Sequence, residues 1–215
     1  MSPGLGVVIA YLVGSIPAAY IAGRMHGVDL RTIGSGNLGA TNVVRTLGWR
    51  VGLPVYLFDT LKGALPVLLL PGATGTPRGG LWAIAFGIAA ILGHVRPIFL
   101  LGKGGGKGVA TAGGVFLGLA PLATAVSIAV FAVTTKLTGY VSLGSLLSAL
   151  ALPLALLVLA GPSSPVLWVS VLVAMFVFWT HRANIARLRR GEENRFGRPA
   201  RAAASDAPPP PAEVG

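Results

Sequence analysis

The sequence predicts an all-α polytopic membrane protein, and three features support this fold class. Hydrophobic residues make up 53% of the 215 residues and charged residues only 11%, a balance outside the range of ordinary soluble domains. Apolar runs of about twenty residues, the length that an α-helix needs to cross a bilayer, recur along the chain. The 17 Lys and Arg residues, against 6 Asp and Glu, fall mainly between alternate runs.

The first two predicted spans cover residues 5–23 and 51–70. Residues 5–23 are uncharged, with no basic segment before them and no convincing cleavage site after them, so we expect a retained helix rather than a signal peptide. The second span contains Asp59 and Lys62, which lie three residues apart on one helical face and are predicted to pair with each other. A proton relay is the less favoured alternative for these two residues.

Three further spans are predicted at residues 80–95, 141–160 and 165–180. Residues 108–135 also lack a charge and form either one long helix or two short helices broken at "GLAP", residues 118–121. A break there places nearly all basic residues in loops on one side of the membrane. The pattern therefore predicts seven transmembrane helices, with the N-terminus outside and the C-terminus in the cytoplasm.

Composition also limits the chemistry. The net charge of +11 is interpreted mainly as a topology signal at the membrane, and no nucleic-acid partner is predicted. The absence of cysteine excludes disulfides, thiolate metal sites and thioester catalysis, and with only three histidines we expect no metal or other cofactor. Residues 1–198 are predicted to form an integral membrane domain, and residues 199–215, rich in Pro and Ala, a disordered tail.

The first candidate functional segment is "GSGNLGATNVVR", residues 34–45, on the predicted cytoplasmic face. Its three glycines permit positive φ, so that backbone N–H groups can point together toward an anion. Arg45 lies four residues after Thr41 and shares a face with it if a helix begins there. The segment supplies further neutral donors from Ser35, Asn37 and Asn42. A phosphate site is favoured over a plain turn, which is the alternative.

Two more polar segments are predicted at the same face. In "KGGGKGVAT", Lys103 and Lys107 flank three glycines before a predicted helix, whose N-terminal dipole favours an anion. Lys107 is followed by Gly108 rather than by Ser or Thr, so the segment is not a nucleotide-binding Walker loop. In "HRANIARLRRGEE", His181 and Asn184 share a helical face, and a structural histidine is as well supported as a functional one.

Cations, hydroxyls and amides without a carboxylate cluster suit a phosphate substrate and disfavour a metal-dependent enzyme. A membrane carrier for organic phosphates is the alternative function. It is disfavoured because the charges gather at one face rather than at the midplane, and because the sequence shows no inverted repeat.

The segments "SGNLGATNVVRTLG", "HVRPIFLLGKGGGKGVAT" and "HRANIARLRRGEE" resemble, in order and spacing, the signatures of the bacterial acyl-phosphate:glycerol-3-phosphate acyltransferases, the PlsY family. This resemblance implies a seven-helix enzyme of the bacterial inner membrane with its active site facing the cytoplasm. It also implies that a fatty acyl group passes from acyl phosphate to the 1-hydroxyl of glycerol 3-phosphate. The product is lysophosphatidic acid, made in the first step of phospholipid biosynthesis, and no cofactor takes part.

The resemblance also implies roles for individual residues. The catalytic candidates are Ser35, Arg45, Lys107, His181 and Asn184. The substrate-binding candidates are Gly36, Asn37, Thr41, Asn42, Gly105, Gly106, Gly108 and Ser142. Glu193 is expected to tie its segment to a basic side chain rather than to perform chemistry. The chain departs from the family pattern by one additional glycine between Lys103 and Lys107, which leaves the role of Lys103 open.

Overall fold

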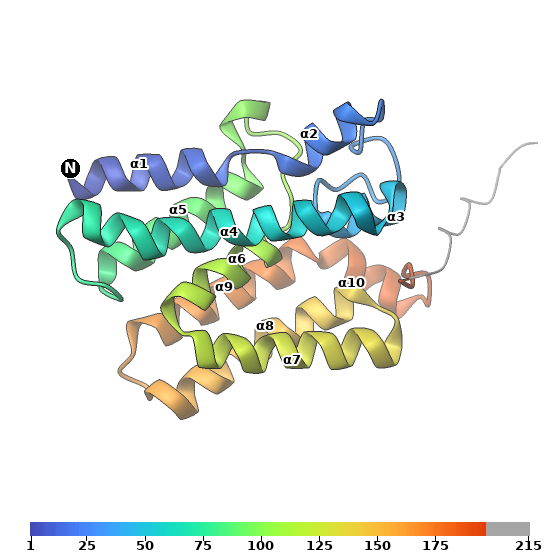
Figure 1. The fold of residues 1–215 in the computed structure, drawn as a ribbon. Coiled ribbons are helices and arrows are strands. Elements are labelled where there is room, and N and C mark those ends of the chain that lie inside the picture. Colours follow the sequence, from blue (N-terminus) through green and yellow to red (C-terminus); the bar gives the residue numbers. More distant parts are fainter. Residues whose placement is uncertain (197–215) are drawn as a thin grey trace, which may run out of the picture.

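A computed structural model of the chain describes residues 1–196, and the predicted tail at residues 199–215 lies outside them. Within residues 1–196 the regular secondary structure is entirely helical, with ten α-helices and one short 3₁₀ turn. Figure 1 shows the long helices running roughly side by side. The predicted all-α class is therefore confirmed.

The retained span predicted at residues 5–23 is made of two helices, α1 (Pro3–Gly14) and α2 (Ala18–Met25), rather than one. The break occurs at Pro17, which has no N–H to donate and cannot continue a helix without a clash. The carbonyl of Ile16 instead accepts a hydrogen bond from Lys62 Nζ, at 2.9 Å. By length and hydropathy the pair still qualifies as one membrane span.

The second apolar segment gives α4 (Trp49–Thr74), preceded by the short amphipathic helix α3 (Ala40–Leu47). Gly48, with φ of 82°, separates the two helices and turns the chain between them. In α4 the predicted pairing of Asp59 with Lys62 is confirmed, because Lys62 Nζ lies 2.6 Å from Asp59 Oδ1.

The next helices are α5 (Leu81–Val95), the 3₁₀ turn η1 (Ile98–Leu100), α6 (Val109–Leu119) and α7 (Pro121–Thr138). The uncharged stretch is therefore two helices, broken at "GLAP" as the charge distribution predicts. At 11 residues, α6 is shorter than a helix needs to cross a bilayer alone.

The chain continues through α8 (Val141–Ala160), α9 (Pro165–Thr180) and α10 (Arg182–Arg189). The axes of α9 and α10 differ by 60°. Counted by length and composition within residues 1–196, five helical segments qualify as spans, or six with the bent α9–α10 pair. The chain is a multi-pass membrane protein, whereas the predicted number of seven spans is not reached by this measure.

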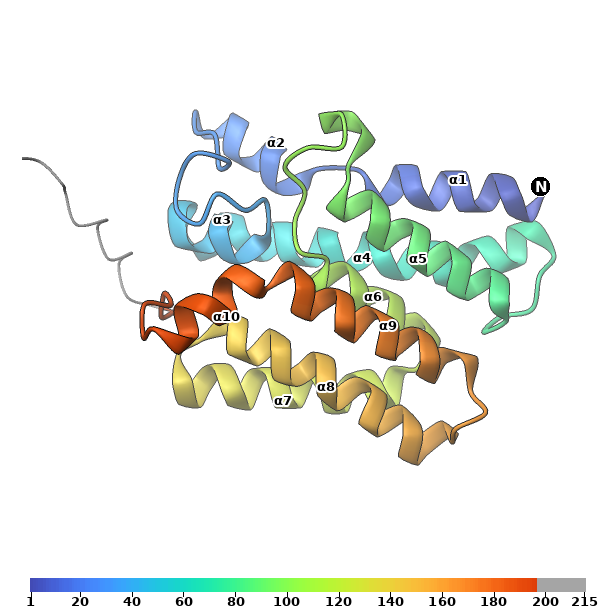
Figure 2. The same ribbon diagram turned by 180° about the vertical axis from the view of Figure 1, so that it is seen from behind.

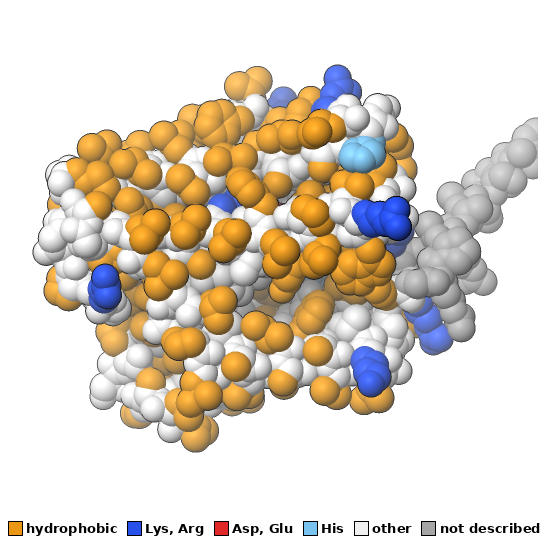
Figure 3. Space-filling view, in the orientation of Figure 1, with side chains coloured by type: hydrophobic (Ala, Val, Ile, Leu, Met, Phe, Trp, Pro, Cys, Tyr) orange, Lys and Arg blue, Asp and Glu red, His pale blue; other side chains and the backbone are white. Residues whose placement is uncertain are grey.

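The arrangement places α6 at the centre of the bundle. Its helix packs closely against α4, because Gly114 meets the Thr60 carbonyl and Gly63 meets that of Thr111, and a side chain on either glycine would overlap the opposing backbone. The α7–α8 hairpin flanks it on one side, and α9 packs against α6 and α8 behind (Figures 1 and 2). Hydrophobic side chains cover much of the lateral surface, as expected of a surface in lipid (Figure 3).

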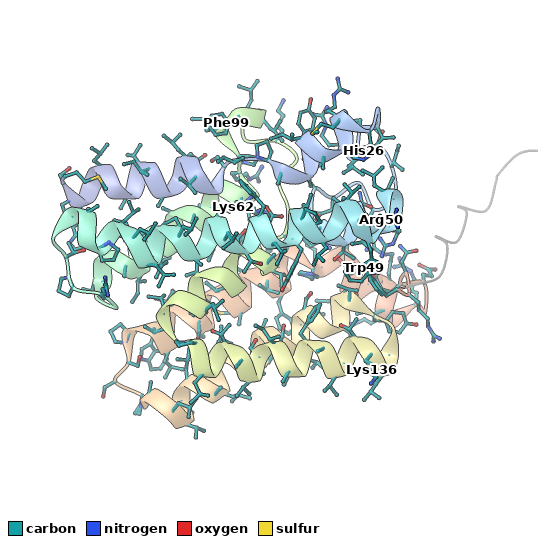
Figure 4. All side chains as sticks on the ribbon, in the orientation of Figure 1. His26, Trp49, Arg50, Lys62, Phe99 and Lys136 are labelled. Carbon is teal, nitrogen blue, oxygen red and sulfur yellow. The ribbon has the colours of Figure 1, made fainter. Side chains whose placement is uncertain are left out.

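Polar elements gather at one end of the bundle. Figure 4 places His26, Arg50 and Lys136 at the end that carries α3 and α10. The turn between α4 and α5, which carries Arg78, lies at the other end (Figure 1). The basic residues therefore segregate toward one end, in the pattern on which the predicted orientation depends.

Candidate active site

The three candidate segments meet at a single cavity of about 490 Å³. The loop before α3, the start of α6 and the start of α10 each supply part of its wall, together with the first turn of α8. The predicted residues that line it are Ser35, Asn37, Thr41, Asn42, Arg45, Lys107, Gly108, Ser142, His181, Asn184 and Glu193. Gly36, Gly105 and Gly106 do not line this cavity.

The first loop is held in shape by Asn42, whose side chain is buried. Its Oδ1 accepts from the N–H of Ser35 at 2.9 Å, and its Nδ2 donates to the carbonyls of Leu30 and Ile33, each at 3.1 Å. Both amide hydrogens are therefore already used. Asn42 holds the loop, and its predicted role as a donor to substrate is not supported by the geometry.

Positive φ occurs at two of the three glycines in this loop, Gly34 (66°) and Gly36 (67°). Gly36 lies close to the Arg31 carbonyl and turns the chain, and its place in substrate binding stays a prediction. Gly39 is extended, with φ of −108°, and precedes α3 as its N-cap.

Arg45 reaches the cavity from α3, which begins at Ala40 as the predicted sharing of a face with Thr41 requires. Burial withdraws its guanidinium from water and lowers its pKa, an effect that nearby Glu193 opposes and Arg187 reinforces. Arginine nevertheless stays charged at any physiological pH. Within residues 1–196, no group accepts a hydrogen bond from this guanidinium or forms an ion pair with it, so Arg45 lines the cavity without a protein acceptor.

Lys107 is the second cation in the cavity wall, and its Nζ donates to Asn184 Oδ1. The pKa of Lys107 is lowered to about 8, chiefly because burial disfavours the charged form. Arg187 and Arg45 lower this pKa further, and Glu193 partly offsets them. Gly108, with φ of 83°, then turns the chain into α6.

The remaining glycines of this loop serve packing. A Cβ on Gly105 would overlap the Val95 carbonyl, and one on Gly106 would overlap the ring of His94. Both glycines therefore pack closely against the end of α5, and their contact with substrate stays a prediction. Lys103 is exposed and lies outside the cavity, next to Gly104, which has φ of 72°.

His181 lies at the bend between α9 and α10, and is buried. Its Nδ1 is 2.8 Å from the Val177 carbonyl, which can only accept, so Nδ1 carries a proton. In the neutral ring Nε2 is then an acceptor at the cavity wall.

Glu193 joins the third segment to its neighbours. Its carboxylate accepts hydrogen bonds from Arg187 Nε and Asn184 Nδ2, each at 2.8 Å, and from Ser142 Oγ at 3.1 Å. The expected contact of Glu193 with a basic side chain is confirmed. With three partners, this carboxylate orients Asn184 and Ser142 along the cavity wall.

Two residues to which the sequence assigns no role in the site, Asp59 and His94, also line the cavity. Their signal in the sequence is a carboxylate inside an apolar run and a histidine that opens the segment "HVRPIFLLGKGGGKGVAT". Within residues 1–196, no three His, Asp or Glu side chains are grouped closely enough to hold a metal ion.

The other part of the cavity is apolar. Trp49, Leu53 and Tyr56 of α4 face Ile128 and Phe131 of α7 across it. The three α4 side chains are each more than 40% exposed, so the cavity continues to the lateral surface of the bundle. One cavity therefore joins a cationic end to an apolar groove that opens toward lipid.

Comparison with known proteins agrees with this geometry. The family model described as glycerol-3-phosphate acyltransferase matches residues 4–191. A glycerol-3-phosphate acyltransferase of Geobacter sulfurreducens is 50% identical over 189 residues, covering 87% of this chain and 94% of the relative. That of Geotalea daltonii is 47% identical over 192 residues, covering 89% and 96%.

Solved structures show the same similarity. The crystal structure of PlsY, an integral membrane glycerol 3-phosphate acyltransferase, in its glycerol 3-phosphate form has a TM-score of 0.84 and 39% identity, covering 91% of this chain and 96% of that one. Its lysophosphatidic acid form has a TM-score of 0.81 and 38% identity, covering 91% and 95%. This chain therefore belongs to the glycerol-3-phosphate acyltransferase family.

Proposed function

We propose that this protein transfers an acyl group from acyl phosphate to the 1-hydroxyl of glycerol 3-phosphate and releases lysophosphatidic acid and phosphate. The observation that carries this proposal is the single cavity with a cationic end and an apolar groove. Both the donor and the product combine a phosphate with an acyl chain, and this cavity offers a place for each part. The glycerol 3-phosphate and lysophosphatidic acid forms of the related PlsY structure support the same assignment.

The reaction needs little more than positioning and charge stabilisation. The 1-hydroxyl oxygen attacks the acyl carbonyl carbon and forms the ester bond, while the bond from that carbon to the phosphate oxygen breaks. Because phosphate is a good leaving group, no covalent enzyme intermediate is required. The hydroxyl proton passes either to His181 Nε2, an acceptor in this tautomer, or to a phosphate oxygen of a substrate.

In this mechanism Arg45 and Lys107 bind the substrate phosphates. Ser35 and Asn37, which also line the cavity, supply neutral donors to the carbonyl oxygen or to the leaving phosphate. His181 and Asn184 orient glycerol 3-phosphate, and Thr41, Ser142 and Gly108 complete its surroundings. Glu193 does not touch substrate but fixes Asn184 and Ser142 through its hydrogen bonds.

The acyl chain is placed between α4 and α7. Apolar side chains such as Leu53 and Ile128 line this groove, and the exposure of Trp49 at its edge lets a lipid-like substrate enter sideways from the bilayer. Because hydrophobic contacts are non-directional, the groove holds the acyl chain without requiring one particular chain conformation.

The proposed orientation puts the active site at the cytoplasmic face of a bacterial inner membrane, because the basic residues gather at that end. Counting the α1–α2 pair once and including the short α6 gives the proposed seven spans. Single cysteines at Ala40, Leu101 and Ala183 should resist an impermeant thiol reagent in intact cells, and labelling of any of them from outside would reverse the orientation.

The direct test is an assay of purified protein with acyl phosphate and glycerol 3-phosphate, with lysophosphatidic acid as the readout. We expect product in excess chelator, and none when acyl-CoA replaces acyl phosphate. If no product forms while proteoliposomes take up glycerol 3-phosphate, the carrier function replaces this proposal.

A further inference from the structure

A second group of charged and titratable side chains lies below the cavity floor, and the mechanism above gives it no role. It consists of Asp59 and Lys62 of α4 and His94 of α5, which are 2%, 3% and 6% exposed. Lys62 Nζ lies 2.6 Å from Asp59 Oδ1, and His94 Nδ1 lies 3.5 Å from the same oxygen. Burying such groups costs free energy even when they are paired, so stability alone is a weak explanation for them.

This cluster connects two irregular parts of the backbone. On one side, Lys62 Nζ donates to the Ile16 carbonyl in the break between α1 and α2. On the other side, the ring of His94 lies directly against Gly106, where a Cβ would overlap Nε2. The N–H of Gly106 also donates to the His94 carbonyl, at 3.3 Å. Asp59 lies between the two sides and contacts both Lys62 and His94.

The position of Gly106 matters because Lys107 follows it and reaches the cavity. The next residue, Gly108, is the N-cap of α6, so a shift at Gly106 moves both the Lys107 cation and the N–H groups at that helix start. His94 and Asp59 themselves border the cavity from below. The ring of His94 is therefore the surface on which the Lys107 segment rests.

We propose that His94, held in place by the Asp59–Lys62 ion pair, is a positioning residue that sets the Lys107 segment against the substrate phosphate. The inference rests on the proposed acyl transfer. It gives a role to His94, the first residue of the second segment, and to Asp59 and Lys62, which lie outside the three segments. His94 acts through Gly106 and Lys107 and does not itself need to touch the reacting atoms.

A space-exchange experiment tests this contact. Gly106→Ala puts a methyl group where the His94 ring lies, and a misplacement of this size should lower kcat/KM by about a hundred-fold. In Gly106→Ala combined with His94→Ala, the methyl group occupies space that the ring has left, and we expect recovery of about ten-fold relative to Gly106→Ala alone. The matched control is Gly113→Ala in α6, where a Cβ meets no atom within 4 Å, and its kinetics should equal those of the wild type.

The split between kinetic constants separates positioning from a merely structural role. If His94 sets the phosphate-binding segment, Gly106→Ala raises KM for at least one of the two phosphate substrates, and the double variant lowers it again. Purely structural damage reduces the amount of active enzyme and leaves both KM values unchanged. The proposal would be overturned if the fold-changes in kcat/KM of the two single variants multiply to give that of the double variant, or if the KM values stay unchanged.

A binding measurement keeps the test independent of catalysis. Inorganic phosphate should raise the melting temperature of the wild type. The increase should be smaller for Gly106→Ala and should be restored in the double variant. If His94→Ala does not fold, His94→Asn serves in its place. Phosphate stabilisation with no product from the wild type would reject the acyl transfer but keep the positioning role, whereas product formation with equal phosphate stabilisation of all variants would reject the positioning role.

Discussion

The protein contains two clusters of charged side chains, one buried and one half-buried, that differ in charge balance and in the open volume beside them. In the lower cluster Asp59 and Lys62 neutralise each other. All three of its members border a cavity of only about 10 Å³, and Asp59 and His94 also reach the larger cavity. In the upper cluster Arg45, Lys107 and Arg187 surround a single carboxylate, Glu193, beside a cavity of about 490 Å³. Members of both clusters line the larger cavity, Asp59 and His94 from the lower cluster and all four residues of the upper one.

The difference indicates how buried charge divides between structure and function. A paired and enclosed cluster has its desolvation compensated within the fold, so it holds backbone segments together. In a cluster with excess positive charge beside an open cavity, that charge is neutralised only when an anion binds. Removing a charge should therefore destabilise the lower cluster, and should impair substrate use in the upper one without loss of stability.

The largest expected effect is in the lower cluster. Lys62→Met leaves the Asp59 carboxylate buried without its partner and should lower the free energy of unfolding by about 3–5 kcal/mol. Asp59→Asn combined with Lys62→Met removes both charges and should regain much of that loss. Thermal unfolding in detergent measures both effects. A double variant that is less stable than Lys62→Met would show that the ion pair is not the source of stability.

In the upper cluster, Arg45→Ala and Lys107→Ala should each lower kcat/KM by about ten- to a hundred-fold, since a charge-assisted contact to a buried anion contributes roughly 1.5–3 kcal/mol. Their melting temperatures should stay the same or rise, because each substitution relieves repulsion among the three cations. Arg50→Ala and Lys136→Ala, at exposed positions of the same end, are the matched controls. If Arg45→Ala or Lys107→Ala lowers stability as well as activity, the two clusters do not differ in the way proposed.

The pH dependence sharpens the same comparison. Lys107 is protonated below its pKa of about 8 and loses its charge as pH rises through that value, so kcat/KM should fall above pH 8 by up to about ten-fold per unit. Lys107→Arg keeps its charge throughout and should flatten this limb. The pH–rate profile of the two enzymes is the measurement, and an unchanged alkaline limb in Lys107→Arg would assign the titration to another group.

The sequence predicts the upper cluster better than the lower one for a physical reason. A short stretch that combines glycines, hydroxyl side chains and a cation, such as residues 34–45, indicates a local anion site. Hydropathy predicts the helices around it. Pairing of Asp59 with Lys62 follows from their spacing in one helix. The contact of His94 with Gly106 depends instead on how α5 packs against a loop, and the orientation of Asn42 toward Leu30 depends on the loop's final shape. Neither contact produces a periodic pattern in the sequence, so neither could be predicted from it.

The additional glycine between Lys103 and Lys107 gives the smallest expected effect. Gly104 has positive φ and lies against the aliphatic part of Arg31, and Lys103 is exposed outside the cavity. From Gly105 onward the loop is fixed by close packing on α5, so a deletion at Gly104 should be taken up on the exposed side. A loop shortened by one residue changes closure entropy by only a few tenths of a kcal/mol.

Deletion of Gly104 should therefore leave most activity, whereas Gly105→Ala should remove most of it, because its Cβ would overlap the Val95 carbonyl and push the Lys107 segment off α5. The kcat/KM of both variants, measured at equal amounts of folded protein, compares the two halves of the loop. If the deletion is as damaging as Gly105→Ala, the spacing from Lys103 to Lys107 is itself functional. Lys103 then belongs with the upper cluster as a further cation for the substrate phosphate.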